Sequence, residues 1–273
     1  MRRAALEARL ERFVREHRVT IAIVFPLVGA VTLVASAAGL LPEPLAFNAL
    51  LLLVGTLVMR LPLVGALAPL VDRRAAAWFG LLVGYAYAIE FVGLRTGWPY
   101  GEFAYTVELG PMVAGVPVGL PVFFVPLVVN AYLLALLLTR GRRGTLPLAL
   151  ALVLAVDLVL DPAAVAIGFW AYPAAGAYYG VPASNYLGWL LSGAVGVVAV
   201  DRAFDRAALL DRLEAVEFAL DDLVSFVLLW GAVNALYGQW MPVALAAALG
   251  VGLVRTDRFD VPQLRAALAW RPS

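Results

Sequence analysis

Long apolar runs separated by short polar connections cover the chain from residue 19 to residue 254. A helix needs about 20 consecutive apolar residues to cross the ~30 Å hydrocarbon core of a bilayer. By this measure the pattern predicts helices over residues 19–40, 45–70, 75–94, 118–139, 145–168, 185–204, 219–237 and 240–254. The last run is short and could instead form half of a helical hairpin. We therefore predict an all-α, polytopic membrane bundle of about eight transmembrane helices.

The distribution of arginine predicts the orientation of this bundle. All 20 basic residues are arginine, and 19 of them fall on alternate connections if each run crosses the membrane once. Cytoplasmic connections carry an excess of positive charge, so we assign that side to the cytoplasm. The chain is then a single integral membrane domain over 1–273, with a charged cytoplasmic leader over 1–18 and a cytoplasmic tail over 255–273. This count assigns Arg60 to a cytoplasmic connection. Arg95 alone is placed on the outer side of the membrane.

Composition supports the membrane assignment and excludes several other classes. The chain is 63% hydrophobic and 14% charged, with a mean hydropathy of +0.91, which is outside the range of ordinary water-soluble domains. The net charge of +1 provides no basic surface for nucleic acid. Cysteine is absent and the one histidine, His17, lies in the leader, which excludes disulfides and zinc or haem ligation within the bundle. We predict a multi-pass protein of the cell membrane that holds no metal.

The connections on the two sides differ in chemistry. Residues 201–222 form a charged cytoplasmic linker that is typical of an amphipathic surface helix. The outer connections over 93–121 and 168–189 are rich in glycine, proline and aromatic residues. An aromatic belt at the headgroups explains part of this composition. We nevertheless expect both outer connections to form ordered caps that fold onto the bundle.

Three acidic residues stand within the apolar runs and are the main candidates for chemistry. They are Glu90, Asp157 and Asp161, and a rise of ~1.5 Å per residue puts them at similar depths in the outer half of the bundle. An ionised carboxylate there costs at least ~2.5–3.5 kcal/mol. Arg95 is the one cation expected nearby, so at least one carboxyl should be protonated at neutral pH. A neutral acid in an apolar pocket can act as a proton donor.

Other polar and aromatic residues are expected in the same region. The candidate hydrogen-bonding residues are Asn130, Asn185, Asn234 and Tyr237. The candidate aromatic walls of a substrate site are Trp98, Tyr100, Trp170 and Tyr172. The asparagines could also simply tie helices together, at about 0.6 kcal/mol for each interhelical hydrogen bond. The segments Trp98–Tyr100 and Trp170–Tyr172 follow Glu90 and Asp161 at similar distances, which suggests an internal repeat of helix and cap.

Three enzymatic chemistries could use acids of this kind. The spacing of Asp157 and Asp161 occurs in diphosphate-binding prenyltransferases, but a second aspartate-rich helix and cations for the diphosphate are missing. Intramembrane aspartyl proteases need two aspartates on different helices, one of them in a Gly-x-Gly-Asp setting that this chain lacks. Acid-catalysed addition of water to an isoprenoid double bond needs only an acid, water and aromatic walls, and is the chemistry we favour.

The segments IEFVGLRTGWPYGEFAYTVELGPMVAGVPVGLP, DLVLDPAAVAIGFWAY and YYGVPASNYLGW occur in this order. Over about residues 75–205 the chain thereby resembles the membrane carotenoid hydratases of the CruF type. The resemblance implies a cofactor-independent hydro-lyase that hydrates the terminal double bonds of an acyclic carotenoid, as in the conversion of bisanhydrobacterioruberin to bacterioruberin. We expect the carotenoid, water and membrane lipid as partners, together with other membrane enzymes of carotenoid biosynthesis.

Physical reasoning assigns roles that the resemblance does not supply. Asp161 or Asp157 is expected to protonate a terminal alkene, and Glu90 to hold the water that adds to the carbocation. Aromatic faces would stabilise that cation by ~2 kcal/mol when desolvated. Two other functions remain open: a proton-coupled transporter or flippase with the acids as a relay, and a carotenoid-binding protein without turnover.

Overall fold

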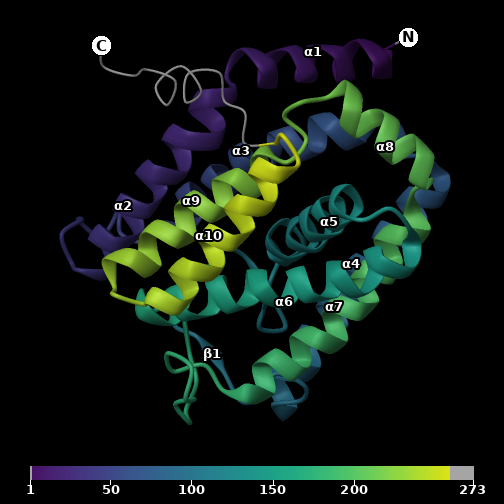
Figure 1. Ribbon diagram of the computed structural model, residues 1–273. Coiled ribbons are helices and arrows are strands. Elements are labelled where there is room, and N and C mark those ends of the chain that lie inside the picture. The colour runs from purple at the N-terminus through teal and green to yellow at the C-terminus, as the bar shows by residue number, and fades with distance from the viewer. Residues whose placement is uncertain (1, 259–273) are drawn as a thin grey trace, which may run out of the picture.

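The computed structural model describes residues 2–258 and is mostly helical (Figure 1). The helices are α1 (Arg2–Glu16), α2 (Phe25–Ala37), α3 (Ala49–Leu67), α4 (Arg73–Thr96), α5 (Leu120–Leu138), α6 (Arg142–Ala166), α7 (Ala183–Ala203), α8 (Arg206–Ala215), α9 (Asp221–Leu236) and α10 (Trp240–Arg255). A π-helical turn over Thr20–Val24 leads into α2, and a 3₁₀ turn over Ala68–Leu70 follows α3. The predicted tail lies outside the described residues from 259 onward.

Six helical segments of the described chain are long and apolar enough to cross a membrane, and they coincide with the first six predicted runs. They are Thr20–Ala37, Ala49–Leu70, Arg73–Thr96, Leu120–Leu138, Arg142–Ala166 and Ala183–Ala203. The last two runs correspond to α9 and α10, which have 16 residues each and therefore extend only ~24 Å. The helical class of the fold is confirmed, whereas the count of eight spans stays a prediction.

Short polar side chains define where several helices begin. The Asn48 side chain accepts hydrogen bonds from the Leu50 and Leu51 amides, both at 3.0 Å, at the start of α3. Asp72 accepts from the Ala75 amide at 2.8 Å at the start of α4. These contacts satisfy amides that have no partner within the helix. These capping contacts place the first residues of α3 and α4 close to the predicted helix starts.

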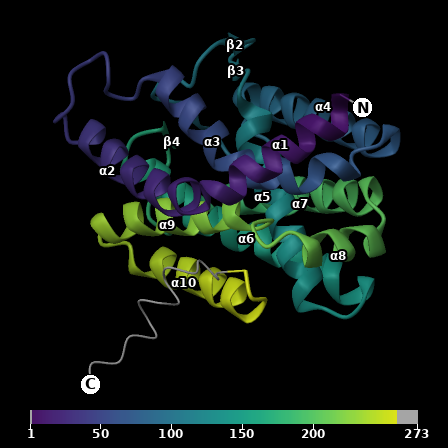
Figure 2. The same cartoon turned by 90° about the horizontal axis from the view of Figure 1, so that it is seen from above.

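Helix α5 forms the centre of the bundle (Figure 1). Every residue from Pro126 to Leu136 on this helix is buried. Helices α6 and α7 pack against α5, and α4 packs against α7. Helices α2 and α10 both pack against α9, and the view in Figure 2 shows α10 at the outer edge of the bundle.

The interpretation of residues 201–222 as a plain surface linker is wrong at its end. Asp221 and Asp222 are fully buried at the start of α9. Asp221 accepts from the Arg18 guanidinium at 2.6 Å and 2.9 Å, and Asp222 forms an ion pair with Arg60. Burial of a carboxylate is tolerated when a hydrogen-bonded cation accompanies it. The bundle therefore contains five acids rather than three, with two cations for the additional pair.

Arg60 lies within α3 and not in a connection, which corrects its assignment to the cytoplasmic surface. Its Nε donates to the Val122 carbonyl at 3.2 Å. Pro126 has no amide hydrogen, so it cannot bond to that carbonyl four residues earlier in α5. Arg60 thus supplies the hydrogen bond that the proline removes and neutralises Asp222 at the same time.

The connections over residues 93–121 and 168–189 are joined to each other by short strands. Strand β1 (Ala104–Tyr105) pairs antiparallel with β4 (Trp170–Ala171), and β2 (Met112–Val113) pairs with β3 (Val116–Pro117). The Thr106 amide extends the first pairing by donating to the Phe169 carbonyl at 3.0 Å. Figure 1 places β1 at the edge of the molecule opposite α1. The connections therefore form one ordered structure across that end of the bundle, which we call the cap.

Candidate active site

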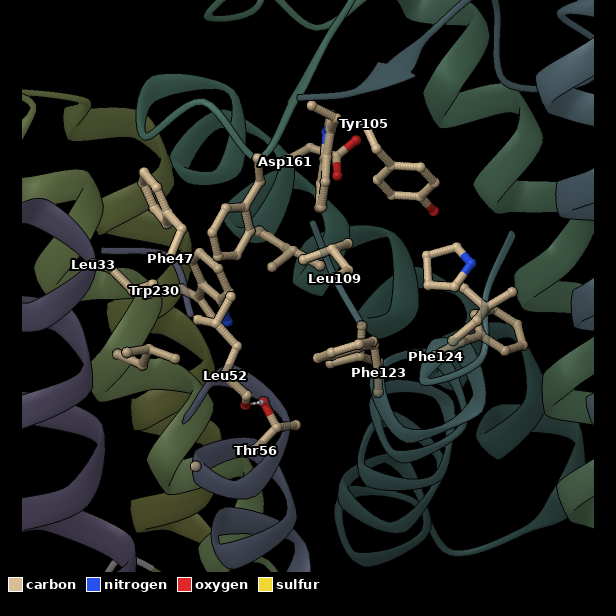
Figure 3. Close-up of a pocket in the computed structure, with 18 of the residues that line it drawn as sticks. Leu33, Phe47, Leu52, Thr56, Tyr105, Leu109, Phe123, Phe124, Asp161 and Trp230 are labelled. Atoms are coloured by element: carbon tan, nitrogen blue, oxygen red, sulfur yellow. Dashed lines mark hydrogen bonds between the residues drawn. The ribbon is translucent and has the colours of Figure 1, made fainter. Parts of the chain in front are cut away.

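A cavity of about 410 Å³ lies beneath the cap. Helices α2 to α7, helix α9 and the cap all contribute to its walls. Figure 3 shows Asp161 and Tyr105 at one end, and Leu52 and Thr56 at the other. Aromatic side chains line the sides between these two ends. The cavity is therefore an elongated apolar space with acids at one end.

Asp161 and Glu90 both line the acidic end of the cavity, from α6 and α4 respectively. Asp161 is 2% exposed and Glu90 is 9% exposed. Asp157 is fully buried one turn earlier in α6 and is not part of the cavity wall. The i, i+4 spacing places the two aspartates on one face of α6. Asp161 lies at the cavity wall, and Asp157 lies farther from the cavity.

Asn185 of α7 holds the two aspartates together. Its Nδ2 donates to Asp157 Oδ2 at 3.2 Å and also to Asp161 Oδ2. Asp157 Oδ1 has no hydrogen-bond partner among the described residues. Two buried carboxyls held by one amide repel each other when both are ionised, so the arrangement favours a single proton on the pair.

Two tyrosines of the cap reach down to the acids. The Tyr172 hydroxyl donates to Asp161 Oδ2 at 3.2 Å, and the Tyr105 hydroxyl donates to Glu90 Oε1. Burial, reinforced by the neighbouring carboxyls, raises the pKa of both tyrosines well above the ordinary value. Both hydroxyls therefore stay protonated and act as donors to the acids.

Tyr105 was not among the residues singled out from the sequence. The repeat had matched Trp98–Tyr100 with Trp170–Tyr172, but the strand register pairs Tyr105 with Trp170. Their rings meet edge-on, with centroids 6.5 Å apart. The alternation in Phe103-Ala104-Tyr105 was the available signal, because it is typical of a strand with one buried face.

A proline in α6 connects the cap to the aspartates. Pro162 has no amide hydrogen, so the Leu158 carbonyl lacks its usual donor. The Tyr178 hydroxyl, from the cap, donates to that carbonyl at 3.3 Å. Burial raises the pKa of Tyr178 to about 12, which keeps this hydroxyl protonated at neutral pH. The cap is thereby attached to the turn of α6 that carries Asp161.

Several candidates lie away from the acids. Asn130 donates to Asp222 Oδ2 at 2.6 Å, in the arginine-paired cluster. Asn234 donates to the Val159 carbonyl at 2.8 Å and so ties α9 to α6. Tyr237 is 38% exposed and lies outside the cavity wall. The periodicity of a single helix did not reveal which neighbour each of these residues would meet.

Two aromatic candidates also have other surroundings. Trp98 is 58% exposed and does not line the cavity. Tyr100 does line it, but its hydroxyl bonds to Ser192 Oγ at 2.7 Å. Arg95, the cation expected near the acids, lies over the Phe91 ring at 4.2 Å from the centroid. Trp170, Tyr172 and Asn185 thus remain with the acids at the cavity.

The cavity can offer a proton from the aspartate pair, a carboxyl at Glu90 and aromatic faces from Trp170, Trp189 and Trp230. Among residues 2–258, no group of three or more acidic or histidine side chains is placed to hold a metal ion. The fold and cavity define a helical protein with membrane-length apolar helices and a largely apolar internal site.

Comparison with known proteins identifies the family. The model of a carotenoid biosynthesis protein family matches residues 47–253, and the chain belongs to this family. It is 62% identical over 258 residues to bisanhydrobacterioruberin hydratase of Haloarcula japonica, an alignment that covers 93% of this chain and 88% of the relative. No solved structure matches the chain.

Proposed function

We propose that this protein is a hydratase that adds water to the terminal C=C bonds of an acyclic carotenoid, of the type bisanhydrobacterioruberin to bacterioruberin. The name of the Haloarcula japonica relative supports the reaction and the substrate class. The observation that carries the proposal is the buried aspartate pair at the end of an apolar cavity. That arrangement brings a proton donor to the end of a hydrophobic chain.

Asp161 is the proposed proton donor because it faces the cavity, while Asp157 stands behind it. Transfer of its proton to the less substituted carbon of the terminal double bond forms a C–H bond and leaves a tertiary carbocation. The charge left on Asp161 is then stabilised by the hydrogen bonds that Asn185 and Tyr172 donate to it. Hydrogen bonds to a developing carboxylate lower the barrier to its formation.

The carbocation would lie between the acids and the aromatic wall. Trp170 and Tyr172 line the cavity beside Asp161, and a desolvated cation over such a ring is stabilised by ~2 kcal/mol. Trp98 has no part in this step, since it is exposed outside the cavity. Aromatic faces suit the intermediate because they attract positive charge without forming a bond to it.

Glu90 is the proposed base. A water bound to its carboxylate adds through oxygen to the tertiary carbon, and Glu90 takes the proton that the water loses. The tertiary alcohol that results differs from the alkene by one water, with no net oxidation or reduction. Asp161 ends ionised and Glu90 protonated, so the next turnover can begin once a proton returns, or with the two roles exchanged. This hydro-lyase chemistry needs no redox cofactor.

We also propose the topology that the arginine distribution predicts, with both termini in the cytoplasm and the cap on the outer side of the cell membrane. Helix α1 and helix α8, both rich in arginine, lie together at the end opposite β1 (Figure 1). In this arrangement α9 and α10 complete eight crossings within a single membrane domain. Helices α9 and α10 are short for a crossing, but a bilayer can become thinner around a short helix.

Expression in a host that makes the unhydrated precursor tests the function. Cells with the intact protein should accumulate carotenoid that has gained one water for each reacted double bond, measured by chromatography and mass spectrometry. Asp161→Asn should lose activity by about 10²–10⁴-fold, while Glu108→Gln, on an exposed cap residue, should behave as the wild type. Unaltered pigment that copurifies with the intact protein would instead indicate a binding protein without turnover.

A further inference from the structure

The cavity opens at one identifiable place. Among its lining residues the most exposed are Val28, at 58%, and Leu51, at 51%, followed by Leu45 and Phe25. All four belong to α2, to α3 or to the segment between these helices. None of the four is charged, and α2 and α3 lie within the apolar spans. The exposed wall therefore lies between α2 and α3, along their apolar spans and at the connection that carries Leu45, which marks this stretch as the opening.

One face of α3 forms the floor inside this opening. Leu51, Leu52, Gly55, Thr56 and Met59 line the cavity and follow the three- and four-residue spacing of a helix face. Gly55 lies at the middle of this face. A side-chain carbon added there would meet no atom within 4 Å. Packing therefore does not require glycine at position 55. The missing side chain leaves the cavity wider where it meets the opening.

We propose that the opening between α2 and α3 is a lateral portal, through which one end of the polyene enters from the bilayer and passes over Gly55 to reach the acids. This inference rests on the proposed substrate class. A conjugated chain is straight, and a carotenoid comparable in length to the ~30 Å hydrocarbon core cannot be enclosed in about 410 Å³. Most of the polyene remains outside the portal, in lipid.

The portal also determines how a substrate with two reactive ends is processed. Only one acidic cluster lines the cavity, so each end must reach the same Asp161. The half-hydrated product must therefore leave through the portal and bind again in the opposite direction. Singly hydrated carotenoid is an obligatory free intermediate, and its level should rise when protein is scarce relative to substrate.

The absence of cysteine from the chain permits a direct test. Gly55→Cys and Gly84→Cys each introduce one small thiol at a position with no atom within 4 Å of the new carbon. Gly84 is exposed on α4 and does not line the cavity, so it is the matched control. The purified, folded variants are alkylated with a bulky thiol reagent, with and without the acyclic carotenoid. Pigment binding is measured by quenching of tryptophan fluorescence, and hydration by chromatography.

Carotenoid at about ten times its Kd leaves roughly one protein molecule in eleven free, so alkylation at Gly55→Cys should slow about tenfold while Gly84→Cys is unaffected. Alkylated Gly55→Cys should then lose pigment binding, and alkylated Gly84→Cys should keep it. Equal alkylation rates with and without pigment, or full binding after alkylation of Gly55→Cys, would overturn the portal. Protection of Gly55→Cys in a protein that never hydrates its pigment would support the portal and reject the hydratase.

Discussion

At the scale of single residues, the site depends on hydroxyl and amide groups that set the state of three carboxyls. Asn185 and Tyr172 donate to Asp161, while Tyr105 donates to Glu90. Each donor favours the charged form of its carboxyl, whereas burial opposes it. The two carboxyls of the cavity wall therefore differ in their surroundings, which suits one to give a proton and the other to receive it.

Tyr105→Phe tests this balance because it keeps the ring against Trp170 and removes only the hydroxyl. Without that donor the Glu90 carboxylate is less stable, so we expect hydration to fall about tenfold, the effect of ~1.4 kcal/mol. The rate of water addition is measured with purified protein. Tyr87→Phe is the control, since its hydroxyl bonds to the Val118 carbonyl at 2.6 Å, outside the cavity wall. An unchanged rate in Tyr105→Phe would remove Tyr105 from the mechanism.

At the scale of helices, the buried ion pair of Arg60 and Asp222 connects α3, α5 and α9. Asp222→Asn leaves a buried guanidinium without its counter-charge, and we expect a loss of about 3–5 kcal/mol in the free energy of unfolding. Glu217→Gln is the matched control, because its side chain and that of Arg15, its partner, are 47% and 46% exposed. Such a pair contributes about 0–1 kcal/mol. Unfolding in detergent should rank the two variants in this order.

Arg212 of α8 connects the leader helix to the end of α3. It donates to the Ala66 carbonyl at 2.7 Å and to Glu11 of α1 at 2.8 Å. Removing this donor in Arg212→Gln should cost about 1–3 kcal/mol, since carbonyls at a helix end lose their partner. Arg9→Gln, at an exposed position on α1, should leave stability unchanged.

The effect of Arg212 should also depend on pH. Hydrogen bonding to Arg212 is the largest cause of the lowered pKa of Glu11. A carboxyl whose pKa is lower in the folded state stabilises the fold above its unfolded pKa and loses this contribution as pH falls through the folded value. The difference between wild type and Arg212→Gln should therefore shrink in acid, which unfolding at a series of pH values would measure. A constant difference would contradict the role of Glu11.

At the scale of the whole molecule, the proposed topology predicts different access to the two ends of the bundle. Ala4→Cys lies on α1 and Glu108→Cys lies on the cap, and both positions are exposed. In intact cells a membrane-impermeant thiol reagent should label Glu108→Cys only, because the proposed topology puts α1 in the cytoplasm. Both should react once the membrane is opened. The reverse pattern would invert the orientation that the arginine count predicts.

The sequence by itself determined the helical class and the approximate bounds of the helices. Apolar length and the placement of arginine depend on the bilayer, whose thickness and surface charge act on each segment separately. The aspartates in α6 were recognisable for the same reason, since a carboxyl in an apolar run is costly wherever the helix packs. The choice of Asp157, Asp161 and Glu90 as candidates rested on that cost alone.

The tertiary structure decided which polar groups meet. Asn130 and Asn185 both lie in apolar runs, yet one contacts Asp222 and the other joins the aspartates of α6. Tyr105 reaches Glu90 because the cap strands pair in one register. Such partners come from distant parts of the chain, and the rotation of each helix and the register of each strand are set by packing against neighbours. A pattern read along one segment does not contain those contacts.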